Sequence, residues 1–231
     1  MTLAPCWPAA DFAYTDRPSK AAYIARVYAP ALRGSVLDVG CGDRLLAEHL
    51  PGIAYTGVDL GPRADVRLDL DREDLPFGTG QFQTVVATDV LEHLDRLHEV
   101  FDACCRIAAR YLLVSLPNPA GEFLLSVAQG SADRLKYYGL PLDAPEDRHR
   151  WFFTSQQAAQ FLRERGARNG FGVERLDVAP GARLTWTGGE GRNRLADPAF
   201  SASTTWCLLA RRHPIAPQDP TPDHAALADD R

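Results

Sequence analysis

The sequence predicts an α/β fold: a Rossmann-like, doubly wound and mostly parallel sheet of seven strands with helices on both faces. Short apolar runs alternate with helix-like patterns along most of the chain, which is typical of a parallel sheet. The first run, VLDVGCG at 36–42, ends in an acid and a glycine-rich turn, and the second, TGVD at 56–59, ends in another acid. In open α/β sheets, ligands bind at the carboxyl ends of the strands, where these residues fall.

The first helix is expected over 18–31, since Pro18 suits a first helical turn and apolar residues recur behind it at helical spacing. A second helix should follow the glycine-rich turn and end before Pro51, because proline does not continue a helix. After the first helix, the expected elements of this half are, in order, strand 35–39, helix 43–50, and strands 54–59, 65–69 and 82–87.

The second half of the chain continues the alternation. Apolar residues at helical spacing predict a helix over 94–109, and Pro117 should end the strand that follows it. Thr154 or Ser155 suits the N-cap of a further helix, which Gly166 would end. The expected elements of this half are, in order, helix 94–109, strand 111–116, helix 155–166, and the closing strands 171–178 and 203–210.

A chain of 231 residues can bury one substantial core. We expect an N-terminal helical cap segment over 1–33, one α/β domain over 34–212, and a disordered tail over 213–231, which is rich in proline and aspartate. Residues 118–153 are the least regular part of the domain. An insertion there would lie over the carboxyl edge of the sheet and act as a lid over a bound molecule.

Composition excludes several classes of partner. The net charge of −5 argues against a nucleic-acid partner, because nonspecific binding to a polyanion needs a basic face. No apolar run approaches membrane-spanning length, and the first residues do not read as a signal peptide. The five cysteines show neither C-x-x-C pairs nor metal-ligand spacing, so we expect free thiols and no metal. We therefore expect a cytoplasmic protein, and its oligomeric state stays open.

The glycine-rich turn indicates a nucleoside site. Asp59 follows Gly40 by about 19 residues, and an acid at that place can accept both hydroxyls of a ribose. A dinucleotide-binding fold would require G-x-G-x-x-G, but Leu45 occupies the position of the last glycine. Asp38 also lies where a pyrophosphate would have to bind. A nucleoside ligand that carries positive charge removes that objection.

Four segments, in order along the chain, resemble the class I S-adenosylmethionine-dependent methyltransferases. DVGCG at 38–42 is similar to the family motif D/E-x-G-x-G-x-G. DLDREDLPF at 69–77 is followed by VLEHL at 90–94, as in the family. YLLVSLPNP at 111–119 and HRWFFT at 149–154 are similar to the family's fifth strand and to the lead into its next helix. The resemblance implies a methyltransferase with S-adenosylmethionine as its cofactor.

The resemblance also implies which residues bind the cofactor. It places the ammonium group beside Asp38, the ribose hydroxyls on Asp59, and the adenine near an acid that follows the third strand. That acid is Asp69 or Asp71, and the strand pattern favours Asp69. The implied cofactor-binding residues are Asp38, Gly40, Cys41, Gly42, Asp59, Leu60, Asp69, Leu70, Asp71 and Thr88.

Methyl transfer is an in-line displacement, so such an enzyme mainly positions the nucleophile. A general base helps only where the acceptor is a hydroxyl or a protonated amine. Candidate catalytic residues are Asp89 and His93 beyond the fourth strand, and His149 before helix 155–166. Asp89 could instead close the cofactor pocket, and His93 could instead serve helix packing.

The acceptor is less constrained. The motif [D/N]-P-P-[Y/F], which marks amino-methyltransferases of flipped bases, is absent, since the position reads TDVL at 88–91. The pattern most resembles the broad group that contains quinone-biosynthetic and natural-product methyltransferases, and this resemblance implies a small-molecule acceptor that is methylated on an O, N or C atom. The alternatives are a macromolecular acceptor (RNA, protein or lipid) and a catalytically silent methyltransferase-like binding protein. Arg44 motivates the silent alternative, because it replaces the third glycine of the first motif and could point outward or crowd the cofactor.

Overall fold

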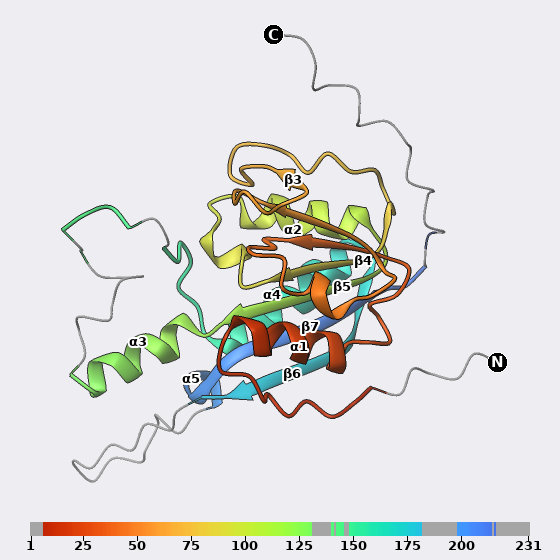
Figure 1. The fold of residues 1–231 in the computed structure, drawn as a ribbon. Helices are drawn as coiled ribbons and strands as arrows, with labels where there is room; N and C mark the ends of the chain where they lie inside the picture. Colours follow the sequence, from red (N-terminus) through yellow and green to blue (C-terminus); the bar gives the residue numbers. More distant parts are fainter. Residues whose placement is uncertain are drawn as a thin grey trace.

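The computed structural model describes residues 7–130, 140, 142–145, 148–181, 198–213 and 215. Its centre is a seven-stranded sheet with the strand order β3-β2-β1-β4-β5-β7-β6 (Figure 1). Strands β1 to β5 are parallel, and β7 runs antiparallel to its neighbours β5 and β6. The predicted fold class is therefore confirmed. The strand order reverses between β1 and β4, which is where open α/β sheets bind their ligands.

The strands alternate with helices along most of the chain. The strands are β1 Ser35–Val39, β2 Ala54–Asp59, β3 Val66–Arg67, β4 Phe82–Thr88, β5 Ala108–Pro117, β6 Phe171–Pro180 and β7 Ala202–Arg211. The α-helices are α1 Arg17–Val27, α2 Leu97–Ile107, α3 Pro119–Ala128, α4 Ser155–Arg168 and α5 Pro198–Ser201, and the 3-10 helices are η1 Ala47–His49 and η2 Leu91–His93.

The central strands are buried on both faces, which is why their sequences are continuous apolar runs. Successive side chains of a strand point to opposite faces. In β4, Val85 therefore joins the core cluster that contains α2 and α4, whereas Val86 joins the cluster that contains α1. Leu112 and Leu113 of β5 divide between the two clusters in the same way. Figure 1 shows this arrangement, with α1 on one side of the sheet and α2 and α4 on the other.

A buried tryptophan anchors α1 to the sheet. Trp206 of β7 is fully buried, and its ring centroid lies 5.3 Å from that of Tyr23 in α1. The Trp206 indole N–H donates to the Tyr14 hydroxyl at 3.0 Å, which also holds the segment before α1 against the sheet. The Lys20 ammonium lies 5.0 Å from the centroid of the Trp206 ring. The aromatic cluster thus sets the position of Lys20, which matters for the site described below.

The prediction of a helix over 43–50 is wrong. Residues 42–46 form turns, and only the three residues of η1 are helical. The backbone explains the difference, because Gly42 and Arg44 both adopt left-handed conformations with φ values of 52° and 61°. A right-handed helix does not pass through such residues. Too few residues then remain before Pro51 to nucleate an α-helix.

Other element boundaries differ by a few residues. Helix α1 begins after Asp16, whose carboxylate accepts the Ser19 N–H at 2.8 Å, and it ends four residues before the predicted limit of 31. β3 has two residues where five were predicted over 65–69. The helix predicted over 94–109 ends at Ile107, and β5 begins at once. Helix termini are the part of a helix that local sequence determines least.

Residues 118–153 begin with a helix that the sequence pattern did not predict. Asn118 caps α3, since its side-chain oxygen accepts the Gly121 N–H at 3.1 Å. Residues 131–139, 141 and 146–147 of the predicted lid lie outside the described residues, as does nearly all of the predicted tail over 213–231. The cap, domain and tail limits therefore stay predictions. Within the described part of the chain, no helix combines the length and apolar character that a membrane crossing requires.

Candidate functional site

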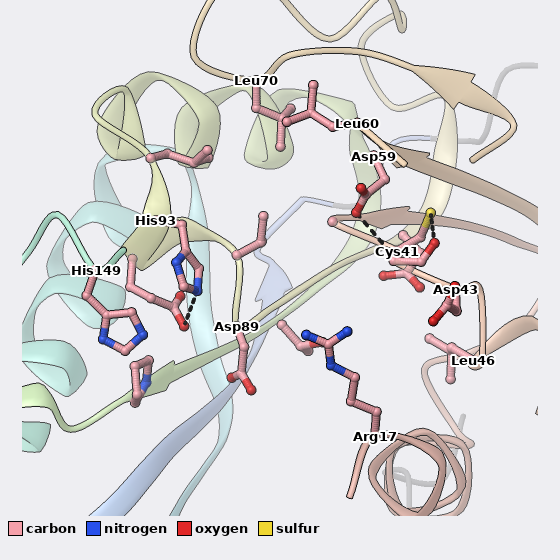
Figure 2. A pocket seen from close by; sticks show the side chains of 18 of the residues that line it. Arg17, Cys41, Asp43, Leu46, Asp59, Leu60, Leu70, Asp89, His93 and His149 are labelled. Carbon is pink, nitrogen blue, oxygen red and sulfur yellow. Dashed lines mark hydrogen bonds and ion pairs between the residues drawn. The ribbon is translucent and has the colours of Figure 1, made fainter. Parts of the chain in front are cut away.

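A cavity of about 1030 Å³ lies at the carboxyl ends of β1, β2 and β4, against α1. Every cofactor-binding and catalytic residue predicted from the sequence lines this cavity. Figure 2 shows Asp59 and Cys41 on one side, His93 and His149 on the other, and Asp89 between them. The sheet explains the convergence, because the carboxyl ends of its parallel strands meet at one edge. A cavity of this size has room for a drug-sized ligand and a second small molecule.

The glycine-rich turn connects β1 to the cavity wall. Gly40 has a φ of 76°, and a Cβ atom built on it would lie 2.6 Å from the Val90 side chain. Gly42 also has a positive φ, but a Cβ there would meet no atom within 4 Å. The turn is tied to β2, since the Gly40 N–H donates to the carbonyl of Val58 at 2.8 Å. Gly40 is therefore required by packing and Gly42 only by backbone conformation.

Asp59 is held in place by two backbone donors. The Gly42 N–H donates to one carboxylate oxygen at 2.9 Å, and the Gly61 N–H donates to the other at 2.8 Å. Each carboxylate oxygen has further lone pairs for other donors. The glycine-rich turn and the acid at the end of β2 are thus one hydrogen-bonded unit, with the carboxylate fixed before any ligand binds.

Asp38 is a buried acid near that unit. Its side chain accepts the Tyr55 hydroxyl at 2.6 Å and is 6% exposed. Burial raises the pKa of Asp38 to about 7, against the effect of the Tyr55 hydrogen bond and with a further contribution from the charge of Asp59. A cation bound beside Asp38 would favour its ionised form. This end of the cavity is therefore suited to a positively charged ligand.

The Cys41 side chain fills the space between the glycine-rich turn and β2. A Cβ atom on Gly57 would lie 2.7 Å from the Cys41 sulfur, so Gly57 leaves the space that the thiol occupies. Burial, together with the charges of neighbouring acids, Asp38 first, raises the pKa of the Cys41 thiol to about 12. The thiol is therefore protonated at neutral pH and is a poor nucleophile.

Arg44 points away from the cavity. Its guanidinium pairs with Asp65 at 2.6 Å and lies 5.4 Å from the centroid of the Tyr55 ring. Asp65 in turn accepts the Gly57 N–H at 2.8 Å, which fixes the pair against β2. Arg44 is not among the lining residues. Of the two orientations left open by the sequence, the described structure has the outward one.

The wall beyond Asp59 is apolar. Leu60 is 62% exposed and Leu70 is buried, and both line the cavity (Figure 2). The two acids considered for an adenine site also line it. Asp69 accepts the Asp71 N–H at 3.0 Å, and Asp71 accepts the Arg96 N–H at 3.2 Å. Since both acids face the same space, the choice between them stays a prediction.

Asp89 forms an ion pair that the sequence did not predict. Its carboxylate contacts the Lys20 ammonium and accepts the Ser115 hydroxyl at 2.5 Å. Its enclosure would raise the pKa of Asp89, but the charge of Lys20 and these hydrogen bonds outweigh that effect and hold it below its ordinary value. Asp89 is thus a weak base. One signal could have indicated Lys20, since the chain has only two lysines.

The histidines His93 and His149 meet on the far side of the cavity. His93 belongs to η2, and His149 belongs to the segment before α4. Their ring centroids are 4.8 Å apart. Glu92, which the sequence analysis did not single out, lies beside His93 and is 1% exposed. The cavity therefore has an acidic end near the glycine-rich turn and a histidine-containing end beyond β4.

A family model described as a methyltransferase domain matches residues 13–169, which contain the glycine-rich turn, both acids and both histidines. The chain belongs to the class I S-adenosylmethionine-dependent methyltransferases. This identification confirms the family, enzyme class and cofactor predicted from the sequence. The individual roles of the lining residues stay predictions.

Two ubiquinone biosynthesis O-methyltransferases are related to this methyltransferase. The protein from Pseudomonas paraeruginosa is 31% identical over 112 residues, which cover 40% of this chain and 43% of that protein. The protein from Thiobacillus denitrificans is 29% identical over 119 residues, which cover 43% of this chain and 51% of that protein. The matches thus span about half the length of these curated relatives.

Solved structures share the methyltransferase fold. An S-adenosylmethionine-dependent methyltransferase from Archaeoglobus fulgidus has a TM-score of 0.57 at 18% identity, covering 85% of this chain and 95% of that one. Magnesium protoporphyrin IX methyltransferase from Synechocystis, solved with bound S-adenosylhomocysteine (SAH), has a TM-score of 0.50 at 19% identity, covering 84% of this chain and 80% of that one. At these identities the similarity shows the fold and carries no information on the acceptor.

Proposed function

We propose that this methyltransferase transfers the methyl group of S-adenosylmethionine to an O, N or C atom of a small molecule, and that both molecules bind in the one cavity. The observation that carries the proposal is the division of this cavity into two chemically different ends. Asp59 lies at one end and His93 and His149 lie at the other (Figure 2), and Asp38 lines the cavity from β1, the strand next to the one that ends in Asp59. The related ubiquinone biosynthesis enzymes, which are named as O-methyltransferases, support a small-molecule acceptor.

The carboxylates at the acidic end match the polar groups of the cofactor. The Asp38 carboxylate would pair with the ammonium group, and the preoriented Asp59 carboxylate would accept the ribose hydroxyls. Leu60 and Leu70 offer an apolar wall for the adenine ring. When bound, the cofactor supplies a methyl group on a sulfonium, which is already an activated leaving group. The protein's remaining task is to hold the acceptor in line with the carbon–sulfur bond.

Lys20 and Asp89 lie between the two ends and neutralise each other. Because the pair leaves Asp89 ionised and bound, we assign it the closing of the cofactor pocket in preference to proton abstraction. This is the alternative that the sequence left open for Asp89. Proton removal, where the acceptor needs it, then belongs to the histidine end of the cavity.

Calorimetric titration with S-adenosylmethionine and SAH, followed by isotope transfer from labelled S-adenosylmethionine to fractionated cell extract, tests the proposal. We expect micromolar binding of both ligands and label in a small-molecule fraction that nuclease and protease treatment leave intact. Label that either treatment removes would point to a macromolecular acceptor. Tight SAH binding without transfer to any fraction would favour the silent binding protein.

The affinity for S-adenosylmethionine should depend on pH through Asp38. In the free protein the pKa of Asp38 is about 7, and the ammonium group should bind its ionised form. Protonation competes with binding below that pH, so the affinity should fall about tenfold between roughly pH 7.5 and 6. Calorimetry across this range measures the effect. Asp38→Asn should bind more weakly at every pH and without this slope, whereas a wild-type affinity that is constant with pH would contradict the assignment.

A further inference from the structure

We propose that Glu92, His93 and His149 bind a divalent transition-metal ion such as Zn²⁺, and that this ion holds a hydroxyl oxygen of the acceptor. One donor atom from each of the three side chains lies within 4.8 Å of the other two. The site lines the same cavity as the acidic end, on the side where the acceptor is expected (Figure 2). The spacing of residues in the sequence predicted no metal. The role assigned to the ion rests on the function proposed above.

The backbone fixes the two halves of the cluster against each other. The Arg150 N–H donates to the Glu92 carbonyl at 2.8 Å. The Trp151 indole N–H donates to the Leu94 carbonyl at 2.7 Å. The segment that carries His149 therefore runs along η2 and is bonded to it at Glu92 and, just after His93, at Leu94. A metal site needs ligands that supporting contacts hold in place, and these bonds provide that support.

The hydrogen bonding of His93 leaves a suitable nitrogen for the metal. Its Nδ1 lies 3.3 Å from the carbonyl oxygen of Arg148, which can only accept a hydrogen bond. With Nδ1 as the donor, Nε2 is the ring nitrogen left to bind a metal, and the Oε1 atom of Glu92 lies 3.8 Å from it. A backbone carbonyl behind the imidazole and a carboxylate in front of it is the usual setting of a histidine metal ligand.

Glu92 adds the negative charge that the site requires. Its side chain is 1% exposed, and a carboxylate in such surroundings is costly to keep ionised. A divalent ion bound to it offsets that cost.

The donor set selects the kind of ion. Two imidazole nitrogens and one carboxylate oxygen suit Zn²⁺ and neighbouring transition ions, whereas Mg²⁺ and Ca²⁺ prefer oxygen ligands. Bonds of about 2.0–2.2 Å place ligand atoms roughly 3.0–3.5 Å apart, so donor atoms that are now up to 4.8 Å apart have to approach each other by roughly 1 Å or more when the ion binds. Three protein ligands leave at least one coordination position for water or an acceptor oxygen.

The ion would account for proton removal at the histidine end of the cavity. A metal-bound hydroxyl has a lowered pKa and releases its proton to solvent at neutral pH. The oxygen lone pair then forms the new bond to the methyl carbon as the carbon–sulfur bond breaks. The electrons of that bond stay on sulfur, so the sulfonium becomes the neutral thioether of SAH, and charge and atoms balance. The acceptor atom inferred from this site is therefore oxygen.

Titration of chelator-treated, metal-free protein with Co²⁺ tests the site, because histidine-bound Co²⁺ absorbs in the visible. We expect one Co²⁺ per chain, displacement by Zn²⁺, and no displacement by millimolar Mg²⁺. Glu92→Gln and His149→Ala should each weaken Co²⁺ binding by at least about tenfold. His49→Ala is the matched control, since His49 is exposed and outside the cavity lining, and it should bind like wild type.

The same metal-free samples are titrated with SAH to separate this inference from the proposed function. SAH binding by His149→Ala shows that its cavity is folded, so a lost Co²⁺ signal then supports the site. Wild-type protein that binds SAH but not Co²⁺ would overturn the metal site and leave the proposed function standing. Co²⁺ binding that survives both substitutions would also overturn it. Failure of wild type to bind either ligand would reject both proposals.

Discussion

Replacing Gly40 with alanine should destabilise the free protein by about 2–5 kcal/mol, whereas the same change at Gly42 should cost about 1–2 kcal/mol. Both glycines have positive φ values, so each substitution carries the conformational penalty of a left-handed residue. Only at Gly40 does the new Cβ also meet a neighbour, at 2.6 Å from Val90. The branched Val90 side chain packs against the core and has little freedom to move.

Urea unfolding of both variants without ligand measures the difference. A double-mutant cycle with Val90→Gly isolates the steric part, because glycine at 90 removes the Cβ that would lie 2.7 Å from the new atom as well as the Cγ2 at 2.6 Å, and it leaves the backbone penalty at Gly40. We expect the cycle to show a coupling of about 1–3 kcal/mol between Gly40 and Val90. Equal destabilisation by Gly40→Ala and Gly42→Ala would show that the turn relaxes and that close packing against Val90 is not what requires glycine.

Replacing Asp59 with alanine should weaken binding of both S-adenosylmethionine and SAH by roughly 1–3 kcal/mol, which is about 5- to 150-fold. Two effects act together. The ribose hydroxyls lose their acceptor, and the Gly42 and Gly61 N–H groups lose the carboxylate that organises the turn. Calorimetry with SAH measures the affinity, and urea unfolding of the free variant reports whether the fold is intact.

Asp43→Ala is the matched control for this prediction. Asp43 also lines the cavity, and its substitution removes the same charge, but its side chain is 60% exposed and pairs loosely with Arg63 at 3.5 Å. An exposed pair of this kind contributes little. We therefore expect an affinity within about twofold of wild type. An Asp59→Ala variant that binds as tightly as Asp43→Ala would place the ribose elsewhere.

The central strands and the cavity residues could be predicted from the sequence because they follow from local patterns. The strand predicted over 35–39 matches β1, and that over 54–59 matches β2. Buried parallel strands are short apolar runs, and the acids that end them are adjacent in sequence to the runs themselves. Since parallel strands share one carboxyl edge, the position of Asp38 and Asp59 in the same cavity followed without knowledge of any side-chain contact.

Local patterns failed where the backbone departs from regular structure. The left-handed conformation of Arg44, stabilised by its contacts with Asp65 and Tyr55, prevents the helix predicted over 43–50. Helix α3 depends on the Asn118 cap and on buried contacts of its first residues, which the apolar pattern alone did not reveal. In both cases the deciding contact is formed by a single side chain, and periodicity does not report such contacts.

By itself, then, the sequence determined the sheet, the edge at which ligands bind, the cofactor and the acids expected to hold it. Only the tertiary structure decided which side chains line the rest of the cavity beside those acids. Lys20 reaches Asp89 across 69 positions of sequence. His149 reaches His93 because the Arg150–Glu92 backbone hydrogen bond joins two distant segments. Motif spacing can reveal ligands on one element, but a cluster assembled across long loops exists only once the chain has folded, because its geometry is set by packing and not by residue order.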